Sequence, residues 1–174
     1  MSFIKRLFGR SETHPREALL PLYAQIVTKA RELHWYEVGQ VPDSVDGRFD
    51  MLAAILALVL LRLEDAPELA QDSVYLTEVF VNDMDGQLRE IGIGDMVVGK
   101  HIGRMMSSLG GRLAAFRDND AGNAALDDAI ARNIYRGAEI DASPARHVRD
   151  GLLAIKANLA ITAPHALRNG DRSW

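Results

Sequence analysis

Cysteine is absent from this 174-residue chain, which excludes disulfides, thiolate catalysis and cysteine-ligated zinc. A long apolar run is lacking too. The longest one, Met51 to Leu61, has 11 residues, whereas a helix needs about 20 to cross a bilayer. This run therefore predicts a buried helix. The first 16 residues lack the apolar core of a secretory signal, so we expect a cytoplasmic protein.

The chain also lacks an excess of basic residues, because its net charge is −4. Residues 1–16 carry +3 and the remainder −7, and an acidic body argues against nucleic-acid recognition. Residues 1–14 form a basic amphipathic segment, with Ile4, Leu7 and Phe8 on one side. We expect residues 1–10 to make weak contact with the inner face of the cytoplasmic membrane, the alternative being a frayed terminus.

The patterning of apolar residues is helical nearly throughout, and no strand alternation appears. With 48% hydrophobic and 25% charged residues, the composition is that of a globular protein. We predict an all-α fold, a single compact domain of about six to seven helices over residues 15–167. Residues 168–174 are polar and are expected to form a flexible tail.

Turn and capping residues predict where the helices begin and end. Helices are expected near residues 15–30, 46–63, 67–91, 95–116 and 124–135, and from Ser143 onward. Gly92 is predicted to end one helix in the left-handed conformation, and Asp95 is predicted to be the N-cap of the next helix. The helix before Gly92 should turn one stripe inward: Val81, Met84, Leu88 and Ile91.

No pattern of catalytic or metal-binding residues emerges. The five histidines include no pair three or four residues apart, and there is no Glu-x-x-His pair. Asp83 to Gly86 begins like a calcium loop, but its sixth position is Leu88 and its twelfth Gly94. We therefore expect no metal, no cofactor and no enzymatic activity.

Several phrases follow one another in a distinctive order. They are Trp35-Tyr36, residues 41–52 (VPDSVDGRFDML), residues 82–85 (NDMD), residues 88–95 (LREIGIGD), residues 98–100 (VGK) and residues 131–137 (ARNIYRG). In this order they resemble the ubiquinol–cytochrome c chaperone family. Two positions depart from the family pattern, Ser44 in place of threonine and Gly110 in place of an aromatic residue.

The resemblance implies an α-helical assembly factor that binds newly made cytochrome b and promotes its maturation into the cytochrome bc1 complex. Mitochondrial members work with a small partner protein and near the ribosome, and this chain looks like the shorter bacterial form. The alternative hypothesis is a helical quinone- or haem-binding protein, or an enzyme, in the same respiratory pathway.

A receptor for membrane-protein clients would present apolar grooves rimmed with acidic residues, because such clients expose apolar helices and basic loops. Asp85 and Arg89, four residues apart, share one flank of their helix. For Asp46 and Asp95 we favour helix capping. The predicted client-binding residues are Trp35, Tyr36, Asp43, Arg48, Asp83, Asp85, Arg89, Glu90 and Lys100. The predicted structural motif comprises Pro42, Asp46, Gly47, Gly92, Gly94 and Asp95.

Overall fold

The computed structural model describes residues 15–117, 122–171 and 174, and this part of the chain contains helices and turns but no strand. The predicted all-α fold is confirmed, and the basic segment predicted for residues 1–14 lies outside the described residues. The helices are α1 (Leu20–Ala30), α2 (His34–Glu37), α3 (Val45–Glu64), α4 (Ala70–Glu90), α5 (Asp95–Arg117), α6 (Gly122–Asn133), α7 (Ala142–Ile161) and α8 (Pro164–Asn169), with short 3-10 helices at Glu17–Leu19 and Pro67–Leu69.

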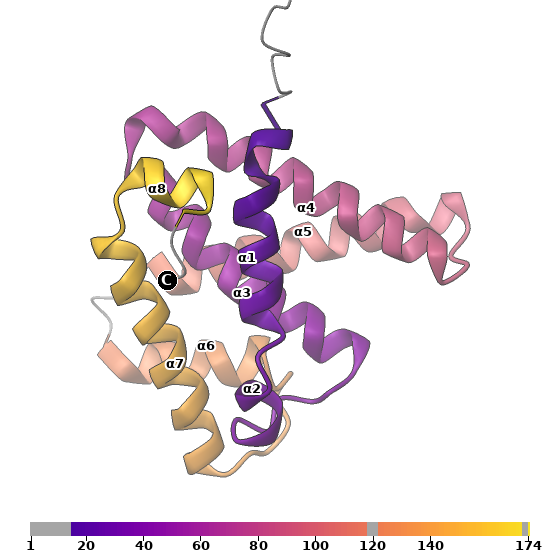
Figure 1. Ribbon diagram of the computed structural model, residues 1–174. Helices are drawn as coiled ribbons and strands as arrows, with labels where there is room; N and C mark the ends of the chain where they lie inside the picture. Colours follow the sequence, from indigo (N-terminus) through magenta and orange to yellow (C-terminus); the bar gives the residue numbers. More distant parts are fainter. Residues whose placement is uncertain (1–14, 118–121, 172–173) are drawn as a thin grey trace, which may run out of the picture.

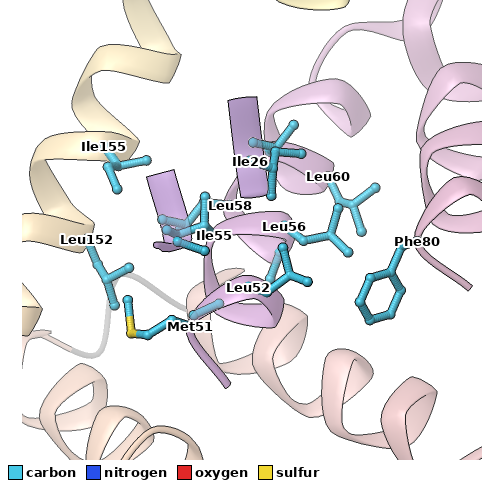
Figure 2. Packing of buried hydrophobic residues seen from close by; sticks show 14 of the residues in the cluster. Ile26, Met51, Leu52, Ile55, Leu56, Leu58, Leu60, Phe80, Leu152 and Ile155 are labelled. Carbon is cyan, nitrogen blue, oxygen red and sulfur yellow. The ribbon is translucent and has the colours of Figure 1, made fainter. Parts of the chain in front are cut away.

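Helix α3 runs through the middle of the molecule, where α1, α4, α5 and α7 pack around it (Figure 1). Every residue from Met51 to Leu60 is buried, as the uninterrupted apolar run predicts. Figure 2 shows these side chains near Ile26 of α1, Phe80 of α4 and Leu152 of α7. Burial stabilises the fold by about 1.5–3 kcal/mol for each large aliphatic side chain. None of the described helices is long and apolar enough to cross a bilayer.

The start of α3 is fixed by the tight turn that precedes it. Ser44 caps the helix, because its hydroxyl accepts a hydrogen bond from the backbone N–H of Gly47 at 3.1 Å. Gly47 lies so close to Pro42 that a Cβ atom would come within 1.9 Å of the proline carbonyl oxygen. The prediction that Asp46 caps the helix is wrong, since its carboxylate accepts a hydrogen bond from Arg136 at 2.7 Å instead.

Helices α4 and α5 form an antiparallel hairpin that projects beyond the other helices (Figure 1). Gly92 ends α4 with a φ of 86°, and the N–H of Ile93 donates to the carbonyl of Leu88 at 3.0 Å, as a left-handed stop requires. Asp95, predicted as the cap of α5, is instead its first helical residue. The carbonyl of Gly94 accepts the first hydrogen bonds of that helix.

The inward face of α4 differs from the predicted stripe at its last position. Met84 and Leu88 are buried and Val81 is half-buried, but Ile91 is 67% exposed. Ile91 follows the last residue of α4 and lies in the connection between α4 and α5, so helical periodicity alone could not show that the core stops short of it.

Two residues of the tail that was predicted to be flexible, Arg168 and Trp174, pack on the body of the molecule. Helix α8 lies beside α1, and the Arg168 guanidinium donates to Asp72 at 2.7 Å. Gly170 ends the helix with a φ of 67°, and Trp174 is buried in the hydrophobic core. A terminal tryptophan offers a large apolar surface, which outweighs the polar residues around it.

One carboxylate is buried near the start of the apolar part of α3. Asp50 accepts a hydrogen bond from Arg112 of α5 at 2.6 Å and another from Arg136, which follows α6, at 2.7 Å. Arg112 is buried as well and also donates to the carbonyls of Ser108 and Asn133. Burial lowers the pKa of Arg112, and the Asp50 carboxylate opposes that change. Three segments far apart in the sequence therefore meet at one charge.

Removing this carboxylate should destabilise the protein strongly. In Asp50→Ala, the Arg112 guanidinium stays buried without its ion partner, so we expect the free energy of unfolding to fall by about 3–5 kcal/mol. Urea denaturation followed by circular dichroism measures this change. The double variant Asp50→Leu/Arg112→Met should recover most of the loss, because it removes both buried charges.

The matched control is Asp43→Ala, which removes an exposed carboxylate that pairs with Arg48. Its unfolding midpoint should stay close to that of the wild type. Equal midpoints for Asp50→Ala and Asp43→Ala would show that the buried ion network does not hold the fold together.

Candidate client-binding groove

A groove of about 250 Å³ opens where the α4–α5 hairpin meets α1 and the start of α3. Each of these four helices contributes to it, so the groove depends on how they pack around α3. Most of its lining is apolar: Val27, Ala30, Val45, Phe49, Leu52, Met84, Leu88, Ile91 and Met105. The polar lining residues are Arg31, Arg48, Asp83 and Gln87.

Two lining residues present large apolar surfaces to solvent. Val45 is 79% exposed and Ile91 is 67% exposed. At the tip of the same hairpin, Met96 is 97% exposed. Exposed apolar residues that lie together on a surface are typical of docking sites. Met84 and Met105 inside the groove have flexible side chains that adapt to differently shaped partners.

Asp83 was predicted to face a client, and it does line the groove. One oxygen of its carboxylate accepts hydrogen bonds from the Tyr23 hydroxyl at 2.7 Å and from Gln87 at 3.0 Å. Burial raises the pKa of the Tyr23 phenol, and the hydrogen bond to Asp83 raises it further. This phenol therefore stays protonated and donates to Asp83 at any physiological pH.

Two other aspartates of the sequence motif, Asp43 and Asp46, pair with arginines of the chain. Asp43 accepts a hydrogen bond from Arg48 at 2.6 Å, which lowers the pKa of the aspartate. Asp46 pairs with Arg136. Two arginines, Arg31 and Arg48, also line the groove. The described lining therefore holds one carboxylate, Asp83, and two guanidinium groups, which differs from the acidic rim expected from the sequence.

Asp85 and Arg89 lie on one flank of α4, as their spacing predicts, and form an ion pair at 2.6 Å. Arg89 also pairs with Asp95 at the start of α5, so it connects the two helices of the hairpin across their turn. These hydrogen bonds raise the pKa of Arg89, with the largest effect from Asp85. Glu90 and Lys100 are exposed on the same hairpin but do not line the groove.

The two aromatic residues of the predicted site are not among the residues that line the groove. Trp35 is buried, its indole N–H donates to the carbonyl of Lys29 at 2.8 Å, and a Cβ atom on Gly151 would come within 2.6 Å of its ring. This burial does not agree with the predicted role of Trp35 on a client-binding surface. Tyr36 is half-buried and donates to the carbonyl of Ala30 at 2.7 Å.

Two histidines from distant positions in the sequence lie next to each other. His34 and His147 lie 113 positions apart in the sequence, yet their Nδ1 and Nε2 atoms are 2.9 Å apart. The other nitrogen of His34 contacts Glu32 at 3.0 Å. Across residues 15–117, 122–171 and 174, no three histidine, aspartate or glutamate side chains come together in a way that could hold a metal ion.

Among the lining residues, only Arg48 and Asp83 had been predicted from the sequence to bind a client. The lining residues that were missed include Arg31, Val45 and Ile91. Val45 lies inside the family phrase but carries no charge or aromatic ring to draw attention to it. Ile91 was assigned to the buried stripe. Nothing in the sequence indicated that Arg31 belongs to a binding site, because a single arginine at the C-terminal end of a helix normally interacts with the helix dipole.

Reversing the charge of Arg89 should loosen the hairpin turn without unfolding the protein. Arg89→Glu places a third carboxylate beside Asp85 and Asp95, so amide hydrogen exchange at the turn should accelerate about two- to threefold. The melting temperature should barely change, because exposed ion pairs contribute little. Arg132→Glu, an exposed position on α6, is the control and should leave exchange at the turn unaltered. Unchanged exchange in both variants would show that Arg89 does not hold the turn.

The chain is similar in sequence to a known protein family and in structure to a solved protein. The family model of the ubiquinol-cytochrome C chaperone matches residues 37–174. The crystal structure of the Cbp3 homolog from Brucella abortus is similar, with 32% sequence identity and a TM-score of 0.80 over 98% of this chain and 96% of that one. No curated protein matches the chain. From the extent of the family match, the chain belongs to the ubiquinol-cytochrome C chaperone family.

Proposed function

We propose that this protein binds newly made cytochrome b through the groove between α1, α3, α4 and α5 and promotes its maturation into the cytochrome bc1 complex. The observation that carries the proposal is an apolar groove with exposed aliphatic residues at its edge, in a chain of the ubiquinol-cytochrome C chaperone family. In this role the protein binds and releases its client and catalyses no reaction.

The groove suits an apolar helix. An amphipathic or apolar helix docks by laying side chains at every third or fourth position into a hydrophobic groove. A membrane protein that has not yet found its partners exposes such helices. Val45 and Ile91 would contact a docked helix at the edge, whereas Phe49 and Met84 would contact it inside the groove.

The test is complementation of a strain that lacks the protein. The wild-type chain should restore cytochrome b and quinol–cytochrome c reductase activity, while bulk translation is the same with and without it. Val45→Gln/Ile91→Gln should fold but fail, because two aliphatic contacts of about 1 kcal/mol each are lost and client affinity falls more than about tenfold.

Val74→Gln/Ile161→Gln is the matched control, since both residues are exposed aliphatics that do not line the groove. It should complement like the wild type. Normal reductase activity in the deletion strain would contradict the proposed function. Full activity of Val45→Gln/Ile91→Gln would instead show that the client binds elsewhere.

A further inference from the structure

Arg31 lies at the edge of the groove without a structural task of its own. It follows the last residue of α1, lines the groove and is exposed. Within the described residues its guanidinium forms no ion pair and donates no hydrogen bond. An arginine in this position often binds the carbonyls that end its helix.

The end of α1 does not need the Arg31 side chain. The carbonyl of Lys29 accepts a hydrogen bond from the indole of Trp35 at 2.8 Å. The carbonyl of Ala30 accepts one from the Tyr36 hydroxyl at 2.7 Å. The terminal carbonyls of α1 are thus bonded by other residues, and the guanidinium of Arg31 remains available.

A second guanidinium lies at the same end of the groove. Arg48 uses its Nε atom to bind Asp43, while its two terminal nitrogens make no hydrogen bond within the described residues. Both Arg31 and Arg48 are near enough to the Tyr36 phenol to oppose the rise in its pKa that burial causes. The one carboxylate in the lining, Asp83, already accepts two hydrogen bonds from the chain.

The two guanidinium groups favour a negative charge on the bound segment. A guanidinium binds a carboxylate through two parallel hydrogen bonds, and such pairs are stronger than neutral ones. A cation placed at the same point would face Arg31 and Arg48, and like charges across an interface disfavour binding. The apolar lining accommodates the remainder of a helix.

We propose that the groove selects apolar helices of membrane-protein clients that carry a carboxylate, which Arg31 binds with Arg48 beside it, over helices that carry a cation there. This inference rests on the proposed function and specifies its client. It also reverses the expectation from the sequence, in which an acidic rim would favour basic client segments.

Three synthetic helical peptides test the proposal. They share a leucine and alanine stripe with serine and glutamine on the opposite face, and they differ only in a Glu, Gln or Lys at the end of the stripe. Fluorescence anisotropy with the full chain should show the Glu peptide binding about tenfold more tightly than the Lys peptide. Arg31→Glu should invert the order, whereas Arg132→Glu should preserve it.

Each other outcome overturns the proposal in a distinguishable way. Equal affinity for the three peptides would make Arg31 a solvated cation and leave the groove and the proposed function standing. No binding of any peptide would exclude the groove as a helix site, and complementation by Val45→Gln/Ile91→Gln then decides the proposed function separately.

Discussion

The buried carboxylate of Asp50 is the constraint on which the arrangement of the helices depends. A charge in the core is costly unless it is paired and hydrogen-bonded, and here α5 supplies Arg112 while the turn after α6 supplies Arg136. Apolar contacts alone are non-directional, so the pairing fixes how α5 and α6 are set against the start of α3. Buried ionic groups of this kind can specify one packing arrangement even where apolar residues would give equal stability.

The same network supports the groove. Phe49 precedes Asp50 in the chain and lines the groove, and the Arg112 guanidinium lies 6.0 Å from the centre of its ring. Arg48, one residue earlier, carries one of the two guanidinium groups at the groove's end. The fold therefore places a rigid wall, formed by the first turns of α3, against the α4–α5 hairpin. A binding surface built on packed helices holds its shape before the client arrives, which reduces the entropy lost on binding.

Some features determined by neighbouring residues were predicted correctly from the sequence, although the helix caps assigned to Asp46 and Asp95 were not. The central place of α3 follows from its uninterrupted apolar run, and the end of α4 follows from Gly92, whose positive φ suits glycine. The charge partners were not predictable, because Asp46 and Arg136 are 90 residues apart. Periodicity shows which face of a helix is apolar, but it does not show where a neighbouring helix stops covering it, so the exposure of Ile91 was missed. A lone aspartate in an apolar helix was the one visible sign of the buried network.

The central claim is that cytochrome b occupies the groove while the protein holds it. Site-specific photo-crosslinking in cells tests this directly, with a photoreactive phenylalanine analogue placed at Ile91 or, as the control, at Ile161 of α7, which is 79% exposed against 67% for Ile91. The account predicts a crosslink to newly made cytochrome b from position 91 and none from position 161. Crosslinking from position 161 with none from position 91 would contradict it.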